Sequence, residues 1–575
     1  EPYRRQRQMC IRDSDSYLGY IRLKPGVFPE QINQKIPALL PKYIDVERER
    51  KQGFDMELYI KPVSEIYTQS TEVKRMVVIM SVLAFALLFV AAMNYILNSV
   101  SSLPIRARSV GVHKCNGASS KDIFNMFLFE TAALFVVALV CMALLLFAFR
   151  EYVADMAAVP TLGTLLNAQT IWLPAIMILA IFILSALLPA RLFSVIPVTQ
   201  VFRVSTSGKQ GWKRSLLFIQ FGGIAFVITL LVIVLLQYDR LMNNDLGYDP
   251  ENIVYAPLNN MDDPETAKLT AEFKKLPYVT ATGLSSMDIL SGYGGFPILD
   301  NEKNWLFTAR QVNYDADYLS LMKIPLLEGQ PLKGDGDILV NESFVSKRGW
   351  TDAAIGKYIY DDEGNLKGKI VGVTRDFMVN SFFTPQLPVI MFGSDRMSYC
   401  NFTVRVSELT PEYLREMNDK IAELFPNEDV GFTVLKTIIE SQYEGTRHFR
   451  DGVFVASIAI LLITLMGLFG YITDEMHRRS KEIAIRKVNG ATAPNILRLL
   501  SKDVLITAFP AILLGVIASR VVGESWLRQF ADKIPLTVFI FISTALLVLA
   551  IIWGCVILKS WNIANENPVR SIKNE

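Results

Sequence analysis

Two stretches of this sequence combine charged, small and apolar residues at helical spacings. They read RSVGVHKCNGAS at residues 108–119 and KEIAIRKVNGAT at residues 481–492, so the pattern recurs after 373 positions. In the second stretch Glu482 and Arg486 are spaced i,i+4 with the acid first, which favours an ion pair along a helix. This chemistry is that of an amphipathic helix surface, because it offers charge and apolar contact but no reactive pair.

Both stretches also carry the signals that end one helix and begin the next. Gly117 and Gly490 follow the basic residues, where a helix end favours positive φ. Thr492 can cap a following helix, and Ser119 and Asp122 are spaced like a capping box. Each stretch therefore predicts a short amphipathic helix, a tight turn and a new helix. A basic loop set only by membrane topology is the alternative, but topology does not require the repeated Gly-Ala-Ser/Thr.

The other residues that could do chemistry do not assemble into a site. The histidines, His113, His448 and His477, lack the spacing of metal ligands, and the acidic run at 361–364 predicts a solvated turn. The string GNLKGKI at 364–370 has the wrong spacing for a phosphate-binding loop and ends in Ile. We therefore expect no catalytic residue, no metal and no cofactor. Any ATPase must be another polypeptide.

Seven apolar runs must position the two repeated stretches. Of the 575 residues, 51% are hydrophobic and only 20% are charged. Each run approaches the ~20 residues that cross a ~30 Å hydrocarbon core. One such run could be a buried core helix, but seven together predict a polytopic α-helical membrane protein. The runs are Met76–Leu97, Met126–Phe149, Ile171–Ala190, Ser215–Gln237, Val453–Ile472, Val504–Val522 and Val538–Leu558.

The basic residues between the runs predict the orientation. Lys and Arg near helix ends mark the cytoplasmic side, and they gather in the segments 98–125, 191–214, 473–503 and 559–575. The opposite side receives 150–170, 523–537 and the long segment 238–452, in which Asp and Glu outnumber Lys and Arg. We therefore expect an acidic external domain in contact with no nucleic acid, because phosphate binding needs a basic surface.

The long external segment has the sequence patterns of a mixed α and β domain. Runs that alternate apolar and polar residues predict strands at 252–258, 337–344, 368–377 and 402–407. Periodic apolar residues predict helices at 267–276 and 411–425. The expected fold class is thus a polytopic helical membrane protein with a large α+β extracytoplasmic domain.

The repeat extends beyond the stretches at 108–119 and 481–492. Residues 20–70 and 402–446 both read as strand, amphipathic helix, strand and entry into a span, and IPVTQVFR at 196–203 parallels NPVRSIKN at 567–574. The chain therefore divides into two modules in tandem, the first without the front of its external domain. We expect a remnant of that first external domain at 15–72, a three-span module at 73–205, a leading span at 206–238, the complete external domain at 239–447 and a second three-span module at 448–575.

The beginning of the chain departs from this plan. EPYRRQRQMCIRDS has arginines with no apolar stretch behind them, so it is not a signal peptide, and residues 1–14 are expected to be non-native sequence. No apolar run precedes Met76, so we expect an upstream span to be missing from the first module.

The repeated stretch resembles the E-I-G-I-R-K-A-L-G-A motif of FtsX-like permeases, the membrane subunits of MacB-type ABC transporters. LLEGQPL, DILVNESFVSKRGW, IGKYI and IVGVTRDFMVNSF resemble the periplasmic core of those permeases. The resemblance covers the chain from about residue 15 to the end. It implies an inner-membrane protein with its large domain in the periplasm and its C-terminus in the cytoplasm.

In that family the loop helix docks on a separate ATPase and couples nucleotide state to the periplasmic domain. The matching positions in the second copy are Lys481, Glu482, Arg486, Lys487 and Gly490. Those in the first copy are Arg108, Ser109, His113, Lys114 and Gly117. Because Ser109 replaces the glutamate and His113 the arginine, the first copy is expected to couple more weakly or asymmetrically.

Two classes of function stay open at this point. The first is a permease subunit whose external domain moves with ATP hydrolysis by a partner, for efflux, lipoprotein release or activation of an envelope enzyme, with a periplasmic adaptor or envelope protein as a further partner. The second is a membrane-anchored sensor or scaffold whose external domain binds a ligand or peptide without driving transport. A membrane enzyme is disfavoured because no active site can be assembled.

Overall fold

The structure is a computed structural model in which the chain forms two compact units. One contains Glu1–Ser70, Met242–Tyr443 and Phe530–Asp532, and the other Thr71–Leu241, Glu444–Gln529 and Lys533–Glu575. We call them the sheet unit and the helical unit. The described residues are 19–47, 58–63, 71–194, 211–259 and 263–564, without the short gaps at 102, 158, 168–170, 291–293, 301, 303, 351–353, 362–363, 380, 382, 384, 395–398 and 427–429. The predicted non-native segment 1–14 and the repeats at 196–203 and 567–574 lie outside them.

Each predicted span is a helix in the helical unit. The helices are α6 (Thr71–Ser101), α8 (Ser120–Ala148), α11 (Trp172–Ser194), α13 (Gly211–Asn243), α19 (Glu444–Arg478), α21 (Ala493–Leu527) and α22 (Val538–Ala564). Among the described residues, six of them are long and apolar enough to cross a membrane, and the apolar part of α11, Trp172–Leu187, is shorter. The helices are longer than the apolar runs because polar residues extend the helix ends.

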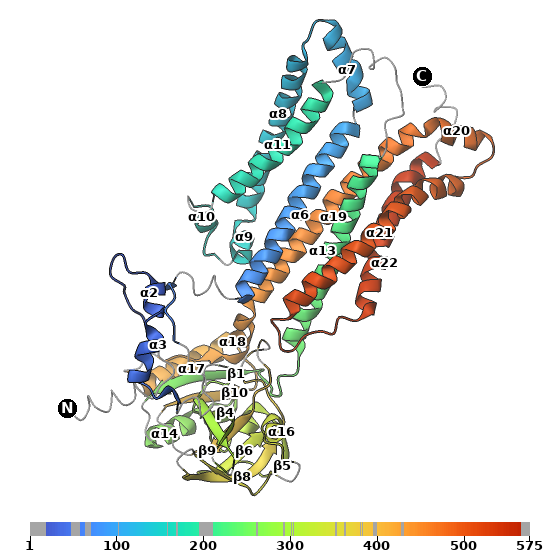
Figure 1. Cartoon of the computed structure of the whole chain (residues 1–575). Helices are drawn as coiled ribbons and strands as arrows, with labels where there is room; N and C mark the ends of the chain where they lie inside the picture. The colour runs from blue at the N-terminus through green and yellow to red at the C-terminus, as the bar shows by residue number, and fades with distance from the viewer. Residues whose placement is uncertain are drawn as a thin grey trace. The chain divides into compact units, whose positions relative to one another are not determined.

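The spans pack in pairs, and α11 also lies along α6 (Figure 1). α6 lies along α19, α8 along α11 and α21 along α22. Inside the unit, Thr229 of α13 donates a hydrogen bond to Thr544 of α22 at 3.2 Å. Gly222 of α13 faces Gly515 of α21 so closely that a Cβ on Gly515 would lie 2.2 Å from the Gly222 carbonyl oxygen. Small residues let two helix backbones approach in this way, and α13 is consequently buried along most of its length.

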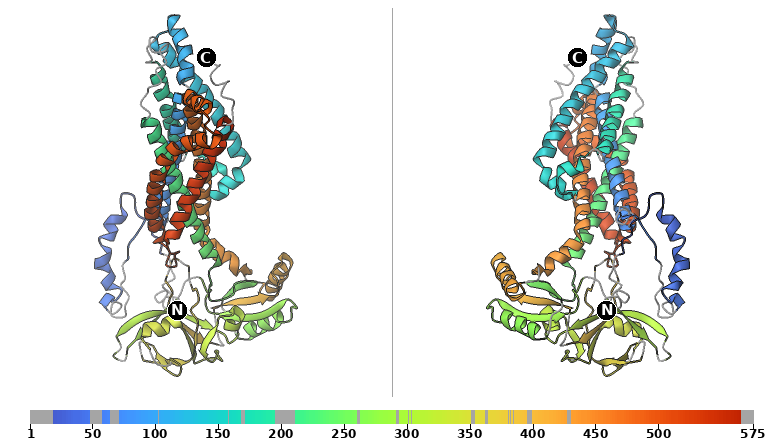
Figure 2. Two further views of the ribbon diagram at one scale, coloured as in Figure 1. Left: turned by 90° about the vertical axis from the view of Figure 1, so that its right-hand side faces the viewer. Right: turned by 90° about the vertical axis from the view of Figure 1, so that its left-hand side faces the viewer.

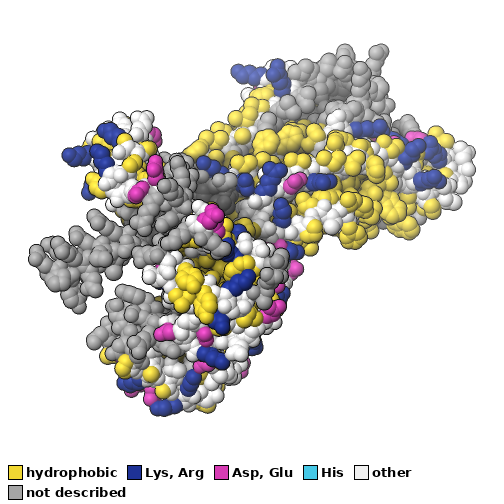
Figure 3. Space-filling model, turned by 60° about the horizontal axis from the view of Figure 1, so that its bottom comes forward, with side chains coloured by type: hydrophobic (Ala, Val, Ile, Leu, Met, Phe, Trp, Pro, Cys, Tyr) yellow, Lys and Arg dark blue, Asp and Glu magenta, His cyan; other side chains and the backbone are white. Residues whose placement is uncertain are grey.

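The outer surface of the helical unit is apolar, as the hydrophobic side chains of Figure 3 show. Large apolar residues are exposed at intervals along α8, including Leu134, Val137, Leu144 and Phe147. A contiguous exposed apolar surface of this extent marks contact with a membrane or a partner. Together with helix length, it identifies the lipid-facing side of the spans.

The sheet unit is built on one mixed sheet, whose strands are seen from two sides in Figure 2. Its order is β11-β1-β10-β2-β4-β9-β6-β8-β5, with β3 beside β4 and β7 beside β8. The strands are β1 (Ile253–Asn259), β2 (Val279–Ser285), β3 (Gly294–Leu299), β4 (Trp305–Tyr314), β5 (Leu326–Gly329), β6 (Asp337–Asn341), β7 (Tyr358–Tyr360), β8 (Leu366–Thr374), β9 (Val389–Gly393), β10 (Tyr399–Val406) and β11 (Thr433–Val434). The pairs β4–β9 and β6–β8 are parallel, and the other pairs are antiparallel.

Two hydrophobic cores lie on this sheet. One forms where α14 (Asp263–Phe273) and α17 (Pro411–Leu424) cover β1 and β10, and it includes Phe273, Phe402 and Met417. The other gathers β4, β6, β8 and β9 under α16 (Glu342–Arg348) around Phe344. α17 begins where Thr410 accepts a hydrogen bond from the Tyr413 amide, as expected of a threonine N-cap. Short helices complete the unit, namely α15 (Tyr318–Met322) and α18 (Leu435–Gln442).

The two halves of the sheet meet at a narrow junction, since β2 pairs β4 through one residue pair, Ser285 and Tyr314. Asp315 strengthens this junction. Its carboxylate accepts hydrogen bonds from the amides of Leu284 at 2.8 Å and Tyr318 at 2.8 Å. Burial nevertheless outweighs these bonds and raises the pKa of Asp315 to about 6.

This raised pKa predicts a pH dependence of the junction. The folded state holds a proton on Asp315 more tightly than the unfolded chain, so stability is highest below the unfolded value of 3.8 and falls as pH rises through about 6. We expect the junction to lose about 2–3 kcal/mol between pH 4 and pH 7. Hydrogen exchange of β2 and β4 amides, corrected for the intrinsic pH dependence of exchange, measures this loss.

Asp315→Asn should remove most of that slope, because the amide cannot ionise. Asp335→Asn is the matched control, since Asp335 is an exposed aspartate of the same unit. An unchanged slope in Asp315→Asn would assign the pH dependence to another group.

The strands predicted at the two ends of 20–70 are not found among the described residues, and one further strand is shorter than predicted. Within 19–47 and 58–63 there is no strand, whereas the helix predicted between the two strands is present as the short helices α2 (Pro29–Asn33), α3 (Ile36–Leu39) and η1 (Leu40–Lys42). Prolines at the starts of α2 and α3 divide this helical segment into short pieces. The strand predicted at 337–344 ends at Asn341, whose side chain accepts from the Phe344 amide and begins α16.

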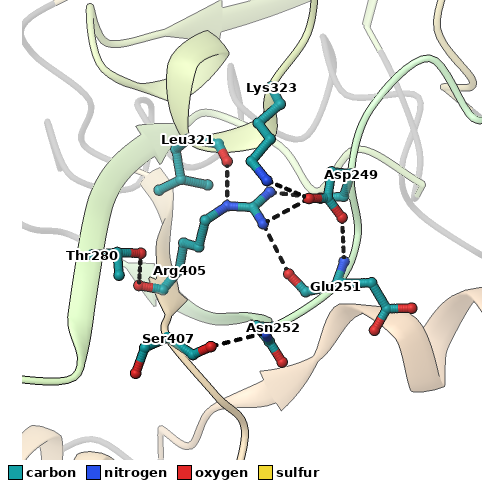
Figure 4. Close-up of polar contacts among 8 residues, drawn as sticks. All are labelled: Asp249, Glu251, Asn252, Thr280, Leu321, Lys323, Arg405 and Ser407. Atoms are coloured by element: carbon teal, nitrogen blue, oxygen red, sulfur yellow. Dashed lines mark hydrogen bonds and ion pairs between the residues drawn. The ribbon is translucent and has the colours of Figure 1, made fainter.

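The segment that joins α13 to β1 is held by a largely enclosed arginine (Figure 4). Arg405 of β10 donates to the carbonyls of Leu321 and Asp249 at 2.7 Å and of Glu251 at 3.0 Å, and to the Asp249 carboxylate at 3.1 Å. Lys323 reaches the same carboxylate at 2.7 Å. Residues 244–252 are therefore fixed to the sheet rather than left as a loose linker.

Candidate docking loops

The second repeated stretch forms a short helix and a turn at one end of the helical unit. Helix α20 (Ser480–Val488) follows α19 after one residue, Arg479. The predicted ion pair is present, with Arg486 2.7 Å from Glu482. Gly490 has φ 87°, which confirms the left-handed turn predicted there. Thr492 occupies the N-cap position of α21, but its side chain makes no capping hydrogen bond.

The first repeated stretch has the same construction. Helix α7 (Leu103–Cys115) is followed by Gly117 with φ 91°. Ser119 accepts from the Asp122 amide while Asp122 accepts from Ser119, which confirms the capping box at the start of α8. In addition, the Lys114 ammonium donates to the Ser194 carbonyl at 2.9 Å. Lys114 thereby binds the end of α11, a role that its basic character did not predict.

The two loops bury and expose equivalent positions. Val110 and Gly111 of α7 are buried, as are Ile483 and Ala484 at the same places in α20. The positions that follow are exposed in both helices, with Val112 at 56% and Ile485 at 61% exposure. The exposed residues are Ser109, Val112 and His113 in one loop and Glu482, Ile485 and Arg486 in the other. Each helix thus presents one polar and apolar surface and anchors itself by the opposite face.

The side chains of two predicted docking residues lie outside what the structure describes. Arg108 belongs to α7 and Lys481 to α20, so both are on the docking helices. Lys487 is half-buried on α20. The predicted residues of each copy therefore share one helix and turn, and each copy forms a separate surface.

A charged cluster beneath α20 was not predicted. Arg479 forms ion pairs with Glu475 of α19 and Asp503 of α21, and Arg214 of α13 lies 3.5 Å from the same Asp503. Glu475 is 9% exposed and Arg479 15% exposed. The repeat did carry a signal, because a shift of 373 positions places Arg106 and Glu130 at the positions of Arg479 and Asp503.

Among the described residues, no group of three or more His, Cys, Asp or Glu side chains could hold a metal ion. In the acidic run at 361–364, Asp361 accepts from the Asn365 amide at 2.7 Å and Gly364 has φ 94°, as in a solvated turn. Burial disfavours the charge of Asp361, but its bonds to Asn365 and Lys367 prevail and lower its pKa to about 2.

Comparison with known proteins places both docking loops in one family. The FtsX-like permease C-terminal family matches residues 81–198 and again residues 454–568. Among solved structures, the chain is similar to the periplasmic region of MacB from Actinobacillus actinomycetemcomitans, with 13% identity over 35% of this chain and 97% of that one and a TM-score of 0.27. It is also similar to the extracellular domain of the ABC-type transporter YknZ from Gram-positive bacteria, with 11% identity over 32% and 99% of the two chains and a TM-score of 0.24. No curated protein matches the chain.

The two family matches contain α7 and α20, and they leave the sheet-rich residues between them outside. The spans, the paired basic loops and the acidic domain between them agree with a multi-pass membrane protein that has a large extracytoplasmic domain. The chain therefore carries two FtsX-like permease domains, one in each half.

Proposed function

We propose that α7 and α20 are the two surfaces on which a separate ABC ATPase docks, and that this permease couples the ATPase cycle to movement of its external domain. The observation that carries the proposal is the shared pattern of exposure in the two loops. Each buries its first apolar residues and presents an exposed aliphatic residue beside a charged or titratable one. An apolar contact with a polar rim is the usual composition of a protein interface.

The connections of the chain support the coupling. α13 runs into residues 244–252 and β1, and β11 and α18 run into α19. The two termini of the external domain therefore continue directly into spans, and α19 ends at the docking helix α20. Rigid helices can carry a displacement between two sites when both sites favour the same one of two states. We place the docking loops and the C-terminus in the cytoplasm from their Lys and Arg content.

The two docking surfaces are not equivalent. Glu482 and Arg486 offer a fixed ion pair, whereas Ser109 and His113 stand at their positions in α7. We propose that α20 contributes more of the binding free energy than α7. The result of the external movement depends on the partner that the external domain contacts. It is expulsion of a substrate, release of a lipoprotein, or activation of an envelope enzyme with an adaptor.

The test exchanges the charges of α20 without removing its internal pair. In Glu482→Lys combined with Arg486→Glu, the two side chains still attract each other, so the helix should persist. Affinity for the ABC ATPase subunit encoded with this permease should fall 10- to 100-fold, because the partner then meets like charges. Surface plasmon resonance with the full chain in nanodiscs measures the affinity.

The matched control exchanges an exposed ion pair on the external domain. Lys436 lies 2.6 Å from Glu251, and the side chains are 50% and 58% exposed. Lys436→Glu combined with Glu251→Lys should leave ATPase affinity unchanged. If the ATPase binds neither the wild type nor the variant, the loops are only topological signals, and a sensor or scaffold whose external domain binds a ligand becomes the better assignment.

A further inference from the structure

The cluster beneath α20 joins α13, α19 and α21 at this end of the second module. Arg479 is the residue between α19 and α20, and its backbone continues both helices, since its amide donates to the Glu475 carbonyl and its carbonyl accepts from the Ile483 amide. Its guanidinium uses Nε for Glu475 and an η nitrogen for Asp503. The fork of donors in arginine fits such a two-carboxylate bridge, and the single ammonium of lysine does not.

The cluster also includes the first turn of α13. Arg214 reaches Asp503 at 3.5 Å, so one carboxylate on α21 connects Arg479 with the helix that leads into the external domain. Tyr471, Leu500 and Val556 line the space beside the cluster. Apolar surroundings strengthen attraction between opposite charges and make an unpaired charge costly. Loss of the Arg479 side chain would therefore remove one ion pair from Glu475 and leave Asp503 with Arg214.

We propose that Arg479 is a positioning residue that sets the angle of the docking helix and transmits its movement to α13 and α21. The proposal rests on the docking function of α20 and adds the residue that transmits docking to the spans. It assigns different roles to Arg479 and Arg486, two arginines of one short segment. Arg486 is 45% exposed and faces outward to a partner, whereas Arg479 faces inward to the spans.

The two copies of the repeat differ at this joint. A shift of 373 positions aligns Arg106 with Arg479 and Glu130 with Asp503, but Ser102 stands at the position of Glu475. The first module therefore has one carboxylate fewer at its joint. The proposal predicts that transmission is stronger through the second module.

The first experiment needs no ATPase. Hydrogen exchange is measured on the full chain in nanodiscs for Arg479→Lys, with Arg498→Lys as the matched control, because Arg498 is an exposed arginine near the start of α21. We expect amides of α20 and the first turns of α13 to exchange at least fivefold faster in Arg479→Lys, and α8 and α11 to be unaffected. Equal exchange in the two variants, or faster exchange throughout the helical unit, would overturn the proposal.

The second experiment separates transmission from docking. With the ABC ATPase subunit, stimulation of ATP turnover is titrated against permease concentration. Arg479→Lys should lower the maximal stimulation at least fivefold and leave the half-maximal concentration within twofold, whereas the exchanged pair at 482 and 486 should raise the half-maximal concentration. A loss of affinity in Arg479→Lys would contradict the proposal. If the wild-type permease does not bind the ATPase, the docking function fails, and the exchange experiment still decides whether Arg479 fixes α20 to α13.

Discussion

We expect Gly515→Ala to lower the free energy of unfolding of the helical unit by 3 kcal/mol or more, about the upper range for an overpacked core. The added Cβ would lie 2.2 Å from the carbonyl oxygen of Gly222 and 3.0 Å from both the Cβ of Ala225 and the amide nitrogen of Phe226. Two of these neighbours are backbone atoms of α13, so no side-chain rotation relieves the contact. The two helices would have to separate along their length.

Gly554→Ala on α22 is the matched control, because a Cβ there meets no atom within 4 Å. Alanine is the better helix former by about 0.5–1 kcal/mol, so this variant should be neutral or slightly stabilising. Thermal unfolding of the detergent-solubilised chain, followed by far-ultraviolet circular dichroism, compares the two. A shift of the same sign and size in both variants would show that the α13–α21 crossing tolerates a wider spacing.

We expect Arg405→Met to destabilise the attachment of residues 244–252 by about 2–3 kcal/mol, because the Asp249 carboxylate loses a charge-assisted hydrogen bond and three carbonyls lose their donor. The Arg405 side chain is 11% exposed, and methionine would fill much of its volume without a donor. The carbonyls of Leu321, Asp249 and Glu251 would each lose a hydrogen bond, and an acceptor left buried costs more than a bond gains. Hydrogen exchange of β1 and β10 amides measures the loss.

Arg375→Met is the control for this prediction. Arg375 pairs with Asp245 at 2.8 Å, but the two side chains are 49% and 59% exposed. Exposed pairs contribute about 1 kcal/mol or less, so exchange at β1 should change little. Arg405→Lys should fall between the two, because one ammonium cannot reach all four acceptors. A result for Arg405→Met as small as that for Arg375→Met would mean that the segment is held by β1 alone.

Much of the fold followed from local signals. Each apolar run became a helix because length and hydrophobicity are properties of the run itself. Gly117 and Gly490 adopt the predicted positive φ because the turn must reverse the chain within a few residues. Strand order was not predictable. The parallel pairs β4–β9 and β6–β8 join residues far apart in sequence. The alternation of apolar and polar residues along one strand does not specify which strand pairs with it.

The candidate docking site, like the fold, was predictable only where its contacts are local in sequence. The Glu482–Arg486 pair lies within one helical turn, so spacing alone predicts it. The bond from Lys114 to Ser194 and the bridge from Arg479 to Asp503 cross between helices, and no local period specifies them. The strand at 337–344 was overextended because Asn341 ends it through its own side chain, a local bond that competes with the sheet.

The pairing of α6 with α19 has a consequence for how the protein is made. Asn94 of α6 donates to the carbonyl of Ile463 at 3.1 Å, and the two residues are 369 positions apart. At about 5–20 residues per second, a ribosome needs roughly 20–75 s to synthesise the chain between them. For that time α6 lies in the bilayer before its main packing partner exists. The large domain between the two halves thus sets a waiting period in membrane assembly.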